Sequence, residues 1–400
     1  MQAEVARRFS AITTENLFAT SDYADYKLWF EQLFGFSVPG IDYAAPTGAS
    51  LGLALIRLPA SGPTRTGSLV TDPGGPGASG VDFVRAARAI FSNDLRSRYD
   101  VVGFDPRGVQ RSQPVQCLSD SEWDTYFALD GSPDTPAEVQ QIVDWSTKIG
   151  KECKARSGAV FQHMSTVESA RDMDILRAAL GEKSLTYFGF SYGTLLGATY
   201  ADLFPTKVGR MVLDGAVDPS LTYTQLQHDQ GRAFELALGR FVEDCDRHTD
   251  CPLPPGTDAG LARLAAFFTS LDSRPLPTGD PARPLTQALG LGSVLDCMYF
   301  PAYGDWDTLR ANLKAAFAGD GTPLLQTFDL YQDRNDSGHY TSNLTSAYLV
   351  VDALDYPDRP GPDQAKVLAN QWAQESPLLG ATFAWGTVPF HWWPTPATGH

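Results

Sequence analysis

The chain lacks any apolar run of the ~18 to 20 residues that a membrane-spanning helix needs. Residues 1–16 have no apolar central region, so no signal peptide is visible there. Basic residues are also scarce, because 31 Lys and Arg stand against 47 Asp and Glu and leave a formal net charge of −16. An acidic surface repels phosphate backbones. We therefore expect neither a membrane span nor a nucleic-acid partner.

Cysteine is the other scarce residue type. The chain has five, at positions 117, 153, 245, 251 and 297, and an odd number at wide spacing is no disulfide framework by itself. What the 400 residues do contain is 43% hydrophobic and 20% charged side chains. That composition supports a sizeable buried core and excludes disorder, collagen and a coiled coil as descriptions of the whole chain.

Short β-branched and aromatic runs closed by Gly, Pro or Asp predict buried strands, and helical spacing appears between them. Ser165 and Glu168 form a capping-box pattern that opens one of these helices, and Gly181 closes it. Strand and helix alternate as in a parallel sheet with helices on both faces. The predicted strands are 51–58, 67–72, 99–105, 185–190 and 208–214, and the predicted helices are 81–98, 165–180 and 193–204.

After Asp218 the sequence becomes mostly helical, with Pro- and Gly-rich loops between the helical patterns. We interpret this part as a helical insertion that covers the sheet. The predicted organisation is an N-terminal extension (1–45), an α/β core (46–218), a helical cap (219–355) and an incomplete return to the core (356–400).

Residues 189–193, Gly-Phe-Ser-Tyr-Gly, fit the G-x-S-x-G pattern, with a predicted strand before them and a predicted helix after them. A side chain exposed at the top of a parallel sheet needs a very sharp turn, and the glycines two residues before and after Ser191 remove the clashing Cβ atoms. The helix behind the serine aims backbone N–H groups and its positive end at developing negative charge. This pattern predicts Ser191 as a nucleophile.

The glycine-rich segment 72–77, Asp-Pro-Gly-Gly-Pro-Gly, follows an early predicted strand. A hydrolase of this architecture needs a backbone N–H from such a loop to converge with that of the residue after the serine. Gly75 and Tyr192 are therefore the expected oxyanion donors. Arg107, in the next loop, is expected to be a buried structural residue paired with an acidic side chain.

These segments together resemble the α/β-hydrolase fold, and more narrowly the proline iminopeptidase and tripeptidyl aminopeptidase family of secreted actinobacterial serine peptidases. The motifs in order are GGPG (74–77), GFSYG (189–193) and LDG (213–215). The resemblance implies a mainly parallel sheet with a helical cap, Ser191 as nucleophile, Gly75 and Tyr192 as oxyanion donors, and cleavage of peptides near a free N-terminus. It also implies disulfides Cys117–Cys153 and Cys245–Cys251, with Cys297 free. No cofactor and no metal are expected.

The family places the triad Asp and His after the Trp-Pro step, which here is Trp393-Pro394, so we expect both residues to lie beyond His400 and the chain to be shortened at its C-terminus. His163 precedes the serine, and His228, His248 and His339 fall in the insertion. Two alternatives stay open. One is an esterase or acyltransferase with the same serine, and the other is a catalytically silent hydrolase-like binding protein. The resemblance also implies that the protein is secreted or held in the cell envelope.

Overall fold

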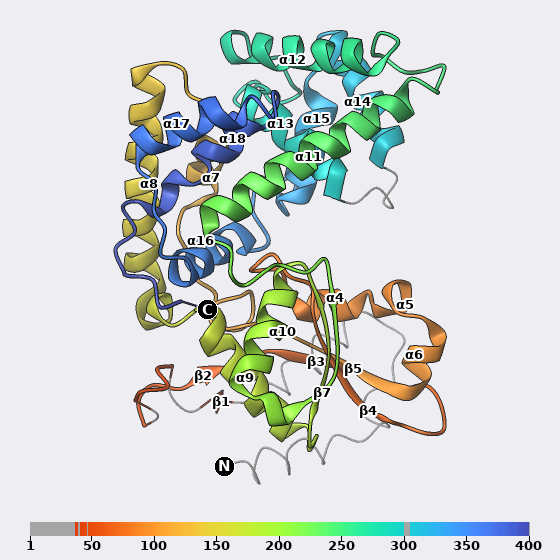
Figure 1. Ribbon diagram of the computed structural model, residues 1–400, viewed down its shortest axis with the longest axis vertical. Coiled ribbons are helices and arrows are strands. Elements are labelled where there is room, and N and C mark those ends of the chain that lie inside the picture. Colours follow the sequence, from red (N-terminus) through yellow and green to blue (C-terminus); the bar gives the residue numbers. More distant parts are fainter. Residues whose placement is uncertain (1–36, 39–40, 46, 300–304, 400) are drawn as a thin grey trace.

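A five-stranded sheet in the order β3-β5-β4-β6-β7 forms the base of the molecule (Figure 1). β4 (Gly67–Asp72) lies at its centre, parallel to β5 (Tyr99–Phe104) and β6 (Leu185–Phe190). β7 (Val208–Asp214) extends the parallel sheet beside β6, and β3 (Leu55–Leu58) pairs antiparallel with β5. The carboxyl ends of β4 and β6 therefore lie next to each other, where ligands bind in open α/β sheets.

The computed structural model describes residues 37–38, 41–45, 47–299 and 305–399. Most of the expected N-terminal extension, 1–45, lies outside these residues. Within them no helix is long and apolar enough to cross a bilayer.

Consecutive strand residues point to opposite faces, and both faces are buried, as in a doubly covered sheet. Leu69 and Val101 belong to one hydrophobic cluster, and Val70 and Val102 belong to the other. The first face packs against α4 (Gly80–Arg85), and the second against α9 (Thr166–Ala179) and α10 (Tyr192–Leu203). The predicted α/β architecture is confirmed.

The prediction of a single helix over 81–98 is wrong. The structure has three short helices there, α4, α5 (Ala87–Ile90) and α6 (Asn93–Arg98). Phe91 adopts an extended backbone, and the hydroxyl of Ser92 accepts a hydrogen bond from the Leu95 N–H and so caps a new helix. The apolar spacing continues through the break because all three helices face the same sheet.

Helices α9 (Thr166–Ala179) and α10 (Tyr192–Leu203) cover the second face of the sheet. The buried guanidinium of Arg107 anchors the loop after β5 to α9, with Nε and Nη2 2.8 and 2.7 Å from the two Asp172 carboxylate oxygens. It also donates to the carbonyl of Ile41 at 2.9 Å. The structural role predicted for Arg107 is confirmed.

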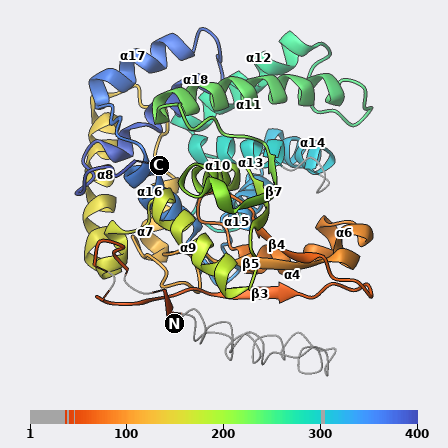
Figure 2. The ribbon, with the colours of Figure 1, turned by 60° about the horizontal axis from the view of Figure 1, so that its bottom comes forward.

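The cap stands over one side of the sheet and contains a hydrophobic cluster of its own (Figures 1 and 2). It is built from α11 (Tyr223–Cys245), α12 (Thr257–Ser273), α13 (Gln287–Tyr299), α14 (Asp305–Phe317) and α15 (Thr322–Tyr331). The next helix, α16 (Leu344–Asp355), belongs instead to the large cluster of the sheet domain. It therefore links the cap to the sheet.

The remaining elements flank this framework. The long α8 (Pro136–Ser157) rises beside the cap with α17 (Pro362–Trp372) and α18 (Gly380–Trp385) (Figure 1).

Disulfides join Cys117 to Cys153 and Cys245 to Cys251, and the buried Cys297 is in neither disulfide, which is the pairing that the resemblance implies. The other elements are α7 (Asp120–Phe127), α17 (Pro362–Trp372), α18 (Gly380–Trp385), β1 (Ser37–Val38), β2 (Leu51–Gly52), η1 (Gly158–Gln162), η2 (Pro205–Lys207) and η4 (Val388–Phe390).

Candidate active site

Ser191 occupies the turn between β6 and α10, and it is exposed. Its backbone has φ 51° and ψ −121°, a left-handed conformation that is strained for a residue with a Cβ atom. Its N–H donates to the carbonyl of Asp214, 2.9 Å away, and its carbonyl accepts from the Thr194 N–H at 2.8 Å. These two hydrogen bonds hold the strained backbone of Ser191 in place, as a nucleophile elbow requires. Asp214 takes part through its backbone, as a structural residue.

The two glycines of the G-x-S-x-G pattern lie where no side chain fits. A Cβ atom at Gly189 would lie 2.3 Å from the Gly193 carbonyl oxygen, and one at Gly193 would lie 2.7 Å from the Asp72 carbonyl oxygen. The prediction that glycine is needed at these two positions to avoid Cβ clashes is confirmed.

The 73–77 loop lies directly against the elbow. A Cβ atom at Gly74 would be 2.5 Å from the Phe190 carbonyl oxygen, and 3.1 Å from both Ser191 Cβ and the Tyr192 nitrogen. Gly74, Gly75 and Gly77 all have positive φ values between 95° and 109°, which only glycine adopts freely. The predicted approach of the two glycine-framed motifs is therefore confirmed.

Two backbone N–H groups beside Ser191 are unused. Those of Gly75 and Tyr192 donate no hydrogen bond to another described residue. Gly75 is exposed, like Ser191, and Tyr192 is the first residue of α10. The convergence of these two groups on one point near Oγ stays a prediction.

The side chain of Tyr192 is locked into a buried hydrogen-bond chain. Its hydroxyl lies 2.6 Å from the Thr166 hydroxyl, which donates to a carboxylate oxygen of Asp355 at 2.6 Å. Asp355 also accepts from the Thr166 N–H at 2.8 Å. The start of α9 and the end of α16 thus hold the residue that follows the serine.

Helix α16 also covers the 73–77 loop. A Cβ atom at Gly77 would lie 2.8 Å from the Leu344 carbonyl oxygen and 3.3 Å from the Tyr348 nitrogen. One turn beyond Tyr348 lies Asp352, which is buried. Burial, with the nearby Asp355 charge, raises the pKa of Asp352 well above its usual range, although a hydrogen bond with Tyr348 acts against the shift.

No histidine contacts Ser191 through a hydrogen bond within the described part of the chain. Each described histidine has a partner of its own: His163 lies by Glu168, His228 by Glu375, His248 by Asp244, His339 by Asp120, and His391 by the carbonyl of Arg359. His400 lies outside the described residues. The expectation that the triad Asp and His lie beyond His400 stays a prediction.

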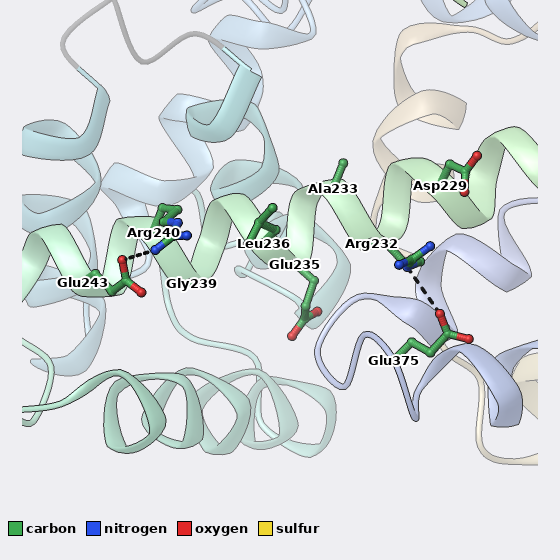
Figure 3. Close-up of a pocket in the computed structure, with 9 residues that line it drawn as sticks. All are labelled: Asp229, Arg232, Ala233, Glu235, Leu236, Gly239, Arg240, Glu243 and Glu375. Atoms are coloured by element: carbon green, nitrogen blue, oxygen red, sulfur yellow. Dashed lines mark hydrogen bonds and ion pairs between the residues drawn. The ribbon is translucent and has the colours of Figure 1, made fainter. Parts of the chain in front are cut away.

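A cavity of about 620 Å³ follows the outer face of α11, and no residue of the elbow or of the 73–77 loop lines it (Figure 3). Most of its charged side chains already have a partner within the protein. Arg232 pairs with Glu375 at 3.3 Å, Arg240 pairs with Glu243 at 2.7 Å, and Glu235 accepts from the Leu379 N–H at 3.1 Å. We interpret this groove as a solvated helix face.

Three carboxylates could together approach a metal ion. Oxygens of Asp130, Glu138 and Asp272 lie within 4.8 Å of one another. Glu138 is already engaged, because it accepts the backbone N–H of Thr135 at 2.9 Å in a capping box. Nothing else at this surface cluster points to a ligand, and it shares no residue with the elbow.

Comparison with known proteins identifies the family. Residues 68–261 match the family described as the alpha/beta hydrolase fold. Serine protease Hip1 of Mycobacterium tuberculosis is 34% identical over 375 residues, which cover 90% of this chain and 70% of that protein. The chain belongs to the α/β-hydrolase serine peptidases.

Two further relatives are an esterase and an aminopeptidase by name. Carboxylesterase B of M. tuberculosis is 38% identical over 372 residues, 90% of this chain and 70% of that protein. Tripeptidyl aminopeptidase of Streptomyces lividans is 41% identical over 219 residues, 53% of this chain and 41% of that protein. Residues 1–47 also match an enoyl reductase FAD-binding domain, but most of them lie outside the described residues. This member of the family is thus a serine hydrolase.

Sequence reasoning missed two parts of the site. It did not assign Thr166, whose hydroxyl joins Tyr192 to Asp355, nor Asp72, whose buried carboxyl accepts the Gly74 N–H at 2.8 Å. Asp72 could have been found, because an acidic residue at the end of a wholly buried strand is unusual and indicates a special role. Thr166 gave no such signal, because its partners are distant in the chain.

Proposed function

We propose that this hydrolase cleaves peptide bonds near a free N-terminus, with Ser191 as the nucleophile and the N–H groups of Gly75 and Tyr192 as oxyanion donors. The observation that carries the proposal is the exposed, left-handed Ser191 with the 73–77 loop packed on its turn. Ser191 Oγ attacks the scissile carbonyl carbon and loses its proton to a base. The amine then leaves with a proton, and water hydrolyses the acyl-enzyme.

A free N-terminus carries an ammonium group, and an anion in the cap would select for it. Most of the carboxylates of the cap and of α16 that could do so already have protein partners: Glu235 (Leu379 N–H), Glu243 (Arg240), Asp244 (Arg247), Asp329 (Arg283) and Asp355 (Thr166). Asp352 has no cationic partner among the described residues.

Asp352 therefore serves best as the ammonium receptor in this proposal. It lies on the helix that covers the 73–77 loop, and burial raises its pKa well above the usual range, so the empty site disfavours the carboxylate. A bound ammonium would lower that pKa and favour the carboxylate, so the substrate itself would promote the ion pair.

Labelling with a fluorophosphonate tests the nucleophile. We expect the full chain to label and Ser191→Ala to lose labelling entirely, while a serine at another exposed site, Ser220→Ala, labels as the wild type does. Labelling that survives Ser191→Ala would end the assignment.

Peptide substrates test the specificity. Asp352→Asn should raise KM for tripeptide amides at least about tenfold, the scale of a charge-assisted hydrogen bond, and leave aryl esters without an amine unaffected. Glu243→Gln is the matched control, because its carboxylate already pairs with Arg240 on the surface. Equal effects of Asp352→Asn on amines and N-acetylated analogues would contradict the ammonium role.

The esterase alternative has support of its own in the 38% identity to carboxylesterase B. A preference for aryl esters over aminoacyl amides would favour it. The silent binding protein is the other alternative, in which no base assists Ser191. Slow, unassisted labelling of the full chain would favour that reading.

A peptide is thus the proposed substrate, and export to the envelope or the medium is the proposed location. The two disulfides support export, since such bonds persist in oxidising compartments. Alkylation under denaturing, non-reducing conditions tests it, because export predicts that Cys297 reacts and that the other four cysteines are protected as disulfides.

A further inference from the structure

Asp72 is a buried carboxyl group with one oxygen used and one unused. It ends β4 opposite Gly189 of β6, and its side chain is almost wholly buried. Oδ1 accepts the Gly74 N–H at 2.8 Å, whereas Oδ2 is buried without a partner among the described residues. Leaving a buried charged oxygen without a hydrogen bond is costly, so this site disfavours the carboxylate.

The carboxyl group lies against the two segments that carry the proposed oxyanion donors. Through Oδ1 it holds Gly74, whose backbone packs on Ser191 and Tyr192. The same oxygen would lie only 3.0 Å from a Cβ atom at Gly193, in the first turn of α10. A change at Asp72 therefore reaches the 73–77 loop and the start of α10 together.

We propose that Asp72 is a positioning residue for the oxyanion loop that works in its protonated form: its oxygen fixes the Gly74 N–H, and loss of its proton places a negative charge behind the forming oxyanion. The inference rests on the proposed roles of Gly75 and Tyr192. In a low-dielectric site an uncompensated negative charge opposes a second one.

Three other titratable groups face Asp72. Asp105, at the end of β5, adds charge repulsion but is itself held by Ser79 at 2.5 Å and Arg111 at 3.3 Å. Tyr187 of β6 and Tyr192 of α10 have pKa values well above the usual range because they are buried, so both stay neutral. Burial raises the pKa of Asp72 to about 7, so its proton is lost within the working range of an enzyme.

Kinetics give the first test. The rate of fluorophosphonate labelling is measured from pH 5.5 to 8.5 for the full chain, Asp72→Asn, Asp72→Ala and the matched control Thr71→Val, whose buried hydroxyl also lacks a partner. Asn keeps an acceptor for Gly74 but has no charge. The labelling rate of Asp72→Asn divided by that of the wild type should rise about tenfold from pH 5.5 to 8.5, because only the wild type gains a buried negative charge as the pH rises. Taking the ratio removes the part of the pH dependence that the two proteins share.

The other variants separate charge from position. Asp72→Ala should label at least about tenfold more slowly than Asp72→Asn at every pH, because the loop loses its anchor and with it a well-placed donor. Thr71→Val should follow the wild type. A flat ratio for Asp72→Asn, or equal rates for the Asn and Ala variants, would overturn the proposal.

A second test needs no activity. In amide NMR spectra of the ¹⁵N-labelled full chain, the Gly74 and Gly75 resonances should shift with one midpoint near neutral pH, and the shift should be absent in Asp72→Asn. Resonances that stay fixed from pH 5 to 9 in the wild type would refute the proposal even if no variant labels. Ser191→Ala decides the proposed nucleophile separately and leaves this titration unchanged.

Discussion

The geometry of the candidate active site depends on single glycines. At Gly74 two independent restrictions coincide, since φ is 95° and a Cβ atom would lie 2.5 Å from the Phe190 carbonyl oxygen. A backbone oxygen cannot move aside as a flexible side chain can. The close approach of the 73–77 loop to Ser191 thus depends on the absence of one methyl group.

Gly74→Ala should therefore abolish fluorophosphonate labelling and lower the free energy of unfolding by about 1 to 3 kcal/mol, because of strain and displacement of the loop. Urea unfolding followed by fluorescence measures the second effect. Gly239→Ala is the control. A Cβ atom there meets nothing within 4 Å, and the helical position should gain about 0.5 to 1 kcal/mol. Normal labelling of Gly74→Ala would contradict the packing argument.

At the scale of elements, the two disulfides close loops of very different length. Cys117–Cys153 spans 36 residues and ties α8 to the segment before α7, whereas Cys245–Cys251 spans 6 at the end of α11. A cross-link stabilises mainly by restricting the unfolded chain, and the restriction grows with loop length.

Replacing both cysteines of a pair by alanine should then cost about 4 kcal/mol for Cys117–Cys153 and about 2 kcal/mol for Cys245–Cys251. Each pair serves as the control for the other, and urea unfolding of the two double variants gives both values. A larger loss from the shorter loop would show that native packing around these cysteines, and not chain entropy, sets their contribution.

The sequence predicts elements well where local signals bound them. β4, β6 and β7 match their predicted ranges residue for residue, because Asp closes β4 and β7 and the G-x-S-x-G turn closes β6. The motifs at 73–77 and 189–193 were recognisable for the same reason. The link from Tyr192 through Thr166 to Asp355 was not, since its partners lie 26 and 189 residues apart and only packing brings them together.

At the scale of the molecule, β7 is an edge of the sheet among the described residues, paired only with β6. An edge strand presents unpaired N–H and C=O groups, which can pair with a second chain. From Arg210 on, its residues alternate between exposed and partly buried, and Val212 keeps 50% of its surface exposed. An apolar side chain beside an open backbone edge favours self-association.

Val212→Lys should accordingly reduce concentration-dependent association, because a lysine on an edge strand opposes strand pairing through charge and solvation. Light scattering of the full chain over a range of concentrations measures the effect. Leu236→Lys, on the outer face of α11, is the matched control: it removes an apolar side chain that is 64% exposed and adds the same charge, but no open backbone edge lies beside it. If both variants reduce association equally, general surface hydrophobicity is the cause, and the β7 edge has no special part in it.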